Sequence, residues 1–125
     1  MKVELYEHAK HYDQVMGWLR KRDIKEVPQE LFAPFGYVID DCAVGFLVKT
    51  DAGVCYIEHM AADPDVEEGR RDKALQLLFV LLENAGRAAG FKMITILTRL
   101  SAMKKRVEER GFSEFGDFTL NYKKL

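Results

Sequence analysis

Hydrophobic and polar residues in the first part of the chain follow two different periods. Residues 2–6 alternate between polar and apolar side chains, which predicts a strand. In residues 8–22 the apolar side chains recur at i, i+3, i+4 and i+7, which predicts an amphipathic helix. Pro28 and Pro34 then bracket a short segment with room for a helical turn or two before the chain becomes extended.

The middle of the chain predicts further extended segments. Residues 36–41 and 43–50 form a hairpin-like pair that turns at Asp40 and Asp41. Residues 54–62 predict the next strand. Pro64 ends this strand, because proline has no N–H to donate to a sheet.

A long helical period follows these strands. Apolar side chains keep the spacing of one helix face from about residue 71 to 90, and Gly90 suits the left-handed position just after a helix end. Residues 93–98 are nearly all apolar, as in a parallel strand that is buried on both faces. With the strand at 54–62 they predict a β-α-β unit, whose strands should be parallel neighbours joined by a right-handed crossover.

The end of the chain predicts a short helix and a final hairpin. Ser101 is a suitable cap for a helix over residues 101–110, and Gly111 stops it. Residues 112–125 are typical of strand, turn at Gly116 and strand. The predicted order is β-α-(α)-β-β-β-α-β-α-β-β, an α/β fold with a mixed sheet. Because no linker or repeat interrupts it, we expect residues 1–125 to form a single domain.

Composition narrows the partners and the compartment. The 125 residues include 19 basic and 20 acidic side chains, so the net charge of −1 gives no general attraction to nucleic acid or to an anionic membrane. Cys42 and Cys55 lack metal-site spacing, and His8 and His11 lack a third ligand, so we expect buried thiols and no metal. The N-terminus has no apolar signal segment, and we expect a cytoplasmic protein.

The segment 57–65, with the sequence IEHMAADPD, resembles the strand-end signature of the Gcn5-related N-acetyltransferase (GNAT) family. In that family an apolar strand that carries a carboxylate runs into a small or aliphatic residue, a variable residue and proline. The order of elements, the long helix after this strand and the Gly111-Phe112 pair also match, so the resemblance spans nearly the whole chain. It implies a GNAT-like fold, acetyl-CoA as co-substrate and an amine of a small molecule or protein as acceptor.

The same part of the chain suits an acyl-coenzyme A site on physical grounds. Where a strand parts from its neighbour, backbone groups lose their sheet partners, so those of residues 59–62 can bind the amides of a pantetheine arm. The following helix start has free N–H groups and a dipole that favour a pyrophosphate. The candidate cofactor-binding residues are therefore His59, Met60, Ala61, Ala62, Gly69, Arg70, Arg71, Asp72, Lys73 and Ala74.

The phosphate segment also has a simpler interpretation. Glu67, Glu68 and Asp72 can compensate the cations, which would make this stretch a solvated charged loop before an amphipathic helix. The family loop has Arg or Gln, two residues, Gly, one residue, and then Gly or Ala. No register of residues 69–76 satisfies all of these positions.

Glu58 is the candidate catalytic base. It stands four residues before Ala62, where several family members carry a catalytic carboxylate, and amine acetylation requires removal of a proton from the nucleophile. The alternative is a structural partner for an arginine such as Arg99.

Strict strand alternation also predicts the face on which Glu58 lies. It puts Glu58 on one face with Tyr56 and Met60, and it puts Ile57 and His59 on the other face.

The competing hypothesis is a non-catalytic protein of the same fold that serves as a binding or assembly module. It is supported by the incomplete glycine loop and by Val107, which stands where the family often has a Tyr acid. Tyr56 and Tyr122 are alternatives for that role. A nucleic-acid-binding domain that uses residues 70–73 and 99–110 is a third hypothesis, which the near-zero net charge disfavours.

The expected acceptor pocket is made by the first helix, residues 28–34 and the final hairpin, and none of these segments names a substrate. Exposed edges of the final hairpin are compatible with a homodimer.

Overall fold

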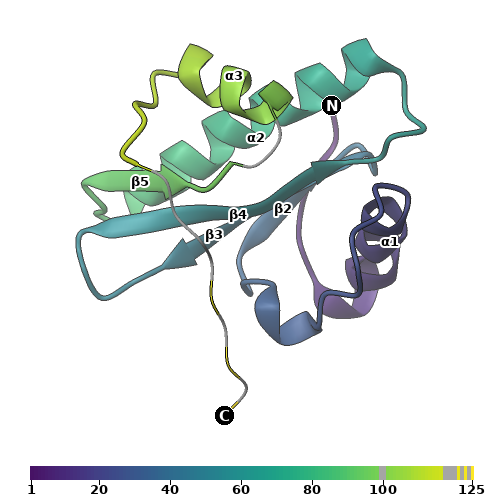
Figure 1. The fold of residues 1–125 in the computed structure, drawn as a ribbon, viewed down its shortest axis with the longest axis horizontal. Helices are drawn as coiled ribbons and strands as arrows, with labels where there is room; N and C mark the ends of the chain where they lie inside the picture. The colour runs from purple at the N-terminus through teal and green to yellow at the C-terminus, as the bar shows by residue number, and fades with distance from the viewer. Residues whose placement is uncertain (99–100, 117–120, 122, 124) are drawn as a thin grey trace.

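The computed structural model of the protein describes residues 1–98, 101–116, 121, 123 and 125. Its elements follow the predicted order as far as the last helix (Figure 1). The strands are β1 (Val3–Leu5), β2 (Gly36–Ile39), β3 (Ala43–Lys49), β4 (Val54–Ala62) and β5 (Met93–Ile96). The helices are α1 (His8–Arg20), the 3₁₀ turn η1 (Gln29–Leu31), α2 (Glu68–Ala88) and α3 (Ser101–Glu109).

The strands form one sheet in the order β1-β2-β3-β4-β5. The first four strands pair antiparallel, whereas β4 and β5 are parallel and α2 connects them. The predicted β-α-β unit is therefore confirmed. Figure 1 shows α1 on one face of the sheet and α2 and α3 on the other, so the sheet is the middle of three layers.

Each helical layer buries an apolar stripe against the sheet, as the helical periods predict. On the α1 face, Val15 and Met16 pack in one cluster with Phe46 of β3. On the α2 face, Phe79 and Leu82 pack in another cluster with residues of β3 to β5. Full burial of one such side chain contributes roughly 1.5–3 kcal/mol to folding.

The start of α1 is held by a histidine. The carboxylate of the N-cap residue Glu7 makes no cap hydrogen bond. Instead, the Nδ1 of His11, a buried residue, accepts the N–H of Glu7 at 3.0 Å, and Nε2 lies 3.0 Å from Glu4 Oε2. Because Nδ1 is the acceptor, Nε2 carries the proton and donates it to Glu4. His11 therefore has a structural role, and no group of three metal-binding side chains occurs among the described residues.

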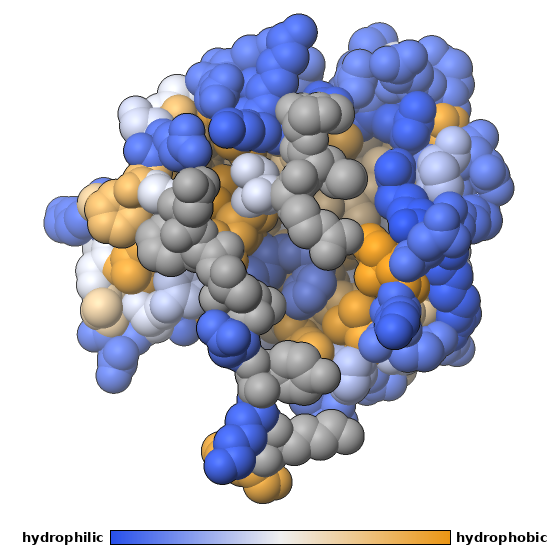
Figure 2. Space-filling view, in the orientation of Figure 1, coloured by the Kyte–Doolittle hydropathy of each residue, from blue (hydrophilic) through white to orange (hydrophobic). Residues whose placement is uncertain are grey.

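The second half of the fold departs from the sequence expectations in two places. α2 begins at Glu68, earlier than the expected start near residue 71. The prediction that β5 is buried on both faces is wrong, because Met93 is 64% exposed and Thr95 is also exposed. Hydrophobic side chains reach the surface at the end of the molecule where β5 lies (Figure 2).

The predicted final hairpin is only partly covered by the structure. Residues 112–116, 121, 123 and 125 are not in strands, and the rest of that prediction falls on residues outside the described part of the chain. Within the described ranges, none of the helices combines the length and the apolar character that a membrane span requires.

Candidate functional site

β4 contains one residue more than β3 requires opposite it. Val44 pairs with Ala61 and Phe46 pairs with Glu58, so two steps along β3 match three steps along β4. The extra residue is accommodated around His59, whose φ of +51° lies in the left-handed region. This arrangement is a β-bulge, which bends the strand that contains it.

The bulge brings Glu58 and His59 to the same face of the sheet. Glu58 faces the α1 layer with its cross-strand partner Phe46. The ring of His59 lies on that face too, with its centroid 5.1 Å from that of Phe32 and 6.3 Å from that of Phe46. Met60 instead packs in the α2-side clusters. The alternation expected for His59 and Met60 is therefore wrong, because the extra residue shifts its phase.

β4 and β5 part beyond the middle of β4. Their parallel pairing runs from Val54↔Met93 to Ile57↔Ile96 and ends there, so residues 58–62 have no partner in β5. The bulge follows immediately and bends β4. The pairing of these strands therefore ends before residue 62, as the sequence predicts, and this unpaired stretch of β4 is here called the opening.

The far end of this opening is tied to the segment after α1. Arg22 donates from Nε and Nη2 to the carbonyl oxygen of Ala62, at 3.1 and 3.0 Å. The preceding Lys21 Nζ lies 3.2 Å from Asp63 Oδ1 and 2.7 Å from Asp65 Oδ2. One backbone group expected to face a pantetheine arm is thus already hydrogen-bonded. Sequence reasoning missed Arg22, because 40 residues separate it from Ala62.

A cavity of about 480 Å³, here called the η1 cavity, lies beside Glu58. Its lining is mostly apolar, with the carboxylates of Glu30 and Glu58 and the ammonium group of Lys49 as charged members. Lys49 Nζ stands 4.8 Å from the centroid of the Phe35 ring. The residues that line it are Glu30, Leu31, Phe32, Ala33, Pro34, Phe35, Leu47, Val48, Lys49 and Glu58. It therefore includes part of the 28–34 segment expected to form the acceptor wall.

The start of α2 is capped by a carboxylate of the chain itself. Glu67 accepts the N–H of Gly69 at 2.8 Å and the N–H of Arg70 at 3.2 Å. A Cβ atom at Gly69 would lie 2.8 Å from Glu67 Oε1, so the missing side chain lets this carboxylate fold back. The candidate phosphate segment 69–74 lies inside the helix. Two N–H groups expected to bind phosphate thus hold Glu67, one of the compensating residues that the sequence suggests.

The positively charged side chains of this segment differ in whether they already have hydrogen-bond or ion-pair partners. Arg70 Nη2 donates to the carbonyl oxygen of Asp40 at 3.1 Å and lies 3.6 Å from its carboxylate. Lys73 is exposed and forms no ion pair with any described residue. Arg71 Nε is buried and has no hydrogen-bond partner in the described ranges. Of the predicted residues, Lys73 is therefore the best placed to meet an anion.

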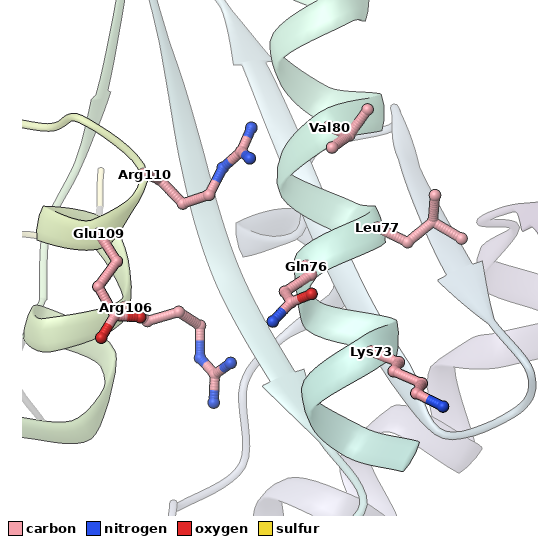
Figure 3. Close-up of a pocket in the computed structure, with 7 residues that line it drawn as sticks. All are labelled: Lys73, Gln76, Leu77, Val80, Arg106, Glu109 and Arg110. Atoms are coloured by element: carbon pink, nitrogen blue, oxygen red, sulfur yellow. The ribbon is translucent and has the colours of Figure 1, made fainter. Parts of the chain in front are cut away.

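A second cavity of about 470 Å³, here called the α2–α3 cavity, separates the two helices on the other face of the sheet. Figure 3 shows Arg106 and Arg110 extending from α3 towards α2, with Lys73 near the start of α2. Arg106 Nη2 donates to Asp72 at 2.8 Å, and Arg110 Nη2 donates to Glu83 at 2.7 Å. The lining residues are Lys73, Gln76, Leu77, Val80, Arg106, Glu109 and Arg110. This lining suits a ligand with both anionic and apolar parts.

The three alanines among the cofactor candidates could contact a ligand only through their backbone groups or a methyl group. Ala61 packs at the α1-side cluster, and Ala62 is buried in the cluster between the sheet and α2. Ala74 is fully buried in the second turn of α2, where backbone N–H groups are used within the helix. A direct ligand contact by Ala74 is therefore not favoured by its position.

No contact among the described residues identifies a replacement for the missing acid. Val107 is buried in the α2-side core and has no polar atom in its side chain. Tyr56, a candidate acid, lies on β4 and is 37% exposed. Tyr122, the other candidate acid, and Arg99, the suggested structural partner of Glu58, lie outside the described residues.

Comparisons with known proteins give matches only at the level of structure. No protein-family model and no curated protein matches the chain. An aminoglycoside acetyltransferase from an uncultured soil metagenomic sample, in complex with sisomicin, matches with a TM-score of 0.68 and 11% identity, over 99% of this chain and 95% of that chain. A putative acetyltransferase from Agrobacterium tumefaciens matches with a TM-score of 0.70 and 11% identity, over 98% and 100%.

A further match includes a coenzyme A derivative. AAC(6')-Iy, in complex with the bisubstrate analog CoA-S-monomethyl-acetylneamine, has a TM-score of 0.63 and 15% identity, over 99% of this chain and 98% of that chain. At such low identity these likenesses concern the arrangement of the backbone. Together with the parted β4 and β5, they show that the chain has the fold of the Gcn5-related N-acetyltransferases.

Proposed function

We propose that the protein is an N-acetyltransferase that moves an acetyl group from acetyl-CoA to a primary amine of a small molecule or protein. The observation that carries this proposal is the opening between β4 and β5, where pairing ends at Ile57 and the bulge at His59 follows. Where a strand lacks a neighbour, its backbone N–H and C=O groups on that side are left unpaired and can bind a ligand. The aminoglycoside acetyltransferase and the putative acetyltransferase described above support the same activity.

In this proposal the co-substrate and the acceptor approach from opposite faces of the sheet. The anionic end of acetyl-CoA lies towards the α2–α3 cavity, where Lys73 offers a positive charge that no described carboxylate neutralises. The pantetheine arm follows the backbone of residues 59–62 through the opening. The acceptor amine occupies the η1 cavity, whose wall includes Glu58. The thioester and the amine then meet beside Glu58.

Glu58 supplies the negative charge at the point of reaction. An amine is protonated near neutral pH and must lose a proton before it attacks the thioester carbonyl. The carboxylate side chain of Glu58 is 41% exposed, which leaves it accessible to a ligand in the η1 cavity.

Thermal unfolding with acetyl-CoA tests the binding step. A ligand at a hundred times its Kd adds roughly 2.7 kcal/mol of stability. For a chain of this size we expect a rise in Tm of about 10 °C. Thiol release across an amine panel then tests turnover, with ADP as a control for a nucleotide that lacks the thioester. An equal shift with ADP and no thiol release would count against the transferase.

A non-catalytic binding module is the second candidate, and the Glu67 cap is the observation that favours it. A carboxylate on the N–H groups of Gly69 and Arg70 competes with any phosphate there. If the module hypothesis holds, millimolar acetyl-CoA leaves Tm unchanged and no amine releases thiol.

A further inference from the structure

His59 adopts a backbone conformation that is uncommon for a residue other than glycine. Its φ of +51° places a non-glycine residue in the left-handed region, at a cost of order 1–3 kcal/mol. Glycine would occupy the same position with less strain. A strained residue beside an opening in the sheet is a candidate for a role beyond folding, provided that its side chain is suitably placed.

The two ring nitrogens of His59 have different surroundings. Nδ1 is buried without a hydrogen-bond partner in the described part of the chain, and it lies 3.9 Å from Glu58 Oε2. The side chain as a whole is 31% exposed, and Nε2 is not among the buried unpartnered atoms. The ring therefore turns Nδ1 towards a carboxylate and leaves Nε2 accessible. A small rotation of Glu58 would close the gap to a hydrogen bond and fix Nε2 as the acceptor nitrogen.

The neighbours of the ring control its charge. Burial lowers the pKa of His59 below its usual value, and the Glu58 carboxylate opposes part of this shift. From the other elements packed on the ring come Phe32 and Phe46, which carry no charge. Glu30 lines the same cavity as Glu58. This lowered pKa favours the neutral imidazole, whose exposed nitrogen is able to accept a proton.

We propose that His59 Nε2 accepts the proton of the acceptor amine, with Glu58 as the residue that positions the ring through Nδ1. This inference rests on the proposed acetyltransferase function and assigns the proton-accepting atom to the neighbour of Glu58. The carboxylate then stabilises the imidazolium that forms, which is the role of an acidic partner in carboxylate–histidine pairs.

The proton and electron balance of the step is complete. Nε2 takes one proton from the ammonium form of the acceptor, and the freed electron pair forms a bond to the acetyl carbonyl carbon. The C–S bond breaks, and its electron pair leaves on the sulfur of coenzyme A. The second nitrogen proton neutralises that sulfur, and the imidazolium returns its proton to solvent. The products are the N-acetyl amine, the free thiol and one released proton.

His59→Asn is the central variant, because asparagine tolerates the left-handed region and cannot act as the base. We expect kcat with the best amine of the panel to fall at least 100-fold, within the usual range for loss of general-base catalysis. The Tm shift with acetyl-CoA should remain. Glu58→Gln should lower kcat about 10-fold and move the acidic limb of the pH–rate profile to lower pH, since the Glu58 charge raises the pKa of His59. His8→Asn serves as the matched control with unchanged kcat.

A titration that does not depend on turnover gives the second readout. The ring C–H signal of His59, assigned by its absence from His59→Asn, should titrate below the usual histidine range and lower still in Glu58→Gln. If the wild type turns over and His59→Asn keeps kcat within threefold, His59 is not the base and the acetyltransferase proposal stands. If Glu58→Gln changes neither the acidic limb of the pH–rate profile nor the titration of the His59 ring, Glu58 does not position that ring. If the wild type neither binds acetyl-CoA nor releases thiol, both proposals fail together.

Discussion

The opening in β4 and the start of α2 belong to the same predicted site, but they differ in whether their backbone groups are available to a ligand. Beyond Ile57 the backbone of β4 has no partner in β5, whereas the first N–H groups of α2 already bind a carboxylate of the chain. Residues 58–62 lack β5 partners because β5 ends at Ile96, opposite Ile57, and an extra residue then shifts the register of β4 against β3. The first N–H groups of α2 are occupied because the neighbouring Glu67 reaches them. Strand pairing fixes the first feature over many residues, whereas a single side chain fixes the second. A ligand can displace a side chain far more readily than it can change a register.

In the proposed enzyme, the fold therefore determines where acetyl-CoA binds, and the Glu67 side chain affects how tightly it binds. The opening provides a place for the thioester whether or not phosphate binds well. Glu67 sets how much the phosphate end contributes, because its carboxylate must leave the N–H groups before an anion takes them.

Arg22→Gln is expected to have the largest effect, and it tests what keeps the end of β4 in place. The arginine donates two hydrogen bonds to the Ala62 carbonyl oxygen, and loss of a charged donor costs about 2 kcal/mol. Tm should fall by about 8 °C in thermal unfolding. Arg20→Gln is the matched control, because Arg20 pairs with Glu26 at the exposed surface and its loss should cost less than about 0.5 kcal/mol. Equal losses would mean that Arg22 does not fasten the strand end.

Glu67→Ala comes next and tests the closed end. Removal of the cap should lower the free energy of unfolding by about 1 kcal/mol, while the Kd for acetyl-CoA should fall several-fold. Denaturant unfolding should therefore show a loss of stability, and calorimetric titration should show tighter binding. Glu68→Ala removes the same charge from the first turn and leaves the cap intact. If both variants tighten binding equally, long-range charge rather than displacement of Glu67 is responsible.

His59→Gly should have the smallest effect on stability, with the opposite sign. Glycine relieves the left-handed strain but adds freedom to the unfolded chain, so we expect a net gain of about 0.5 kcal/mol. Chemical denaturation measures it, and turnover should fall as in His59→Asn. A loss of stability instead would show that the contacts of the ring with Phe32 and Phe46 outweigh the strain.

The parts of the fold that depend on local periodicity were predictable. The apolar spacing of α2 and the glycine at position 90, with φ of +89°, are local signals, and the parallel pairing of β4 and β5 follows from general connection rules. The faces of His59 and Met60 were not, since alternation assumes an unbroken register. The exposed face of β5 was missed because an apolar run does not show whether anything covers it.

The site itself was predictable only where residues act close to their neighbours in sequence. Glu67 was one of the suggested compensating carboxylates, because a cap acts over two or three residues. Arg22 and the role of His59 depend on contacts that only the folded chain brings together.

The consecutive residues Lys21 and Arg22 fasten the segment after α1 to the end of β4. The same segment continues to η1 and to Phe32 and Phe35, which wall the η1 cavity. One continuous segment thus holds both the unpaired end of β4 and the wall of the η1 cavity, so a variant that releases Lys21 or Arg22 is expected to loosen the two together.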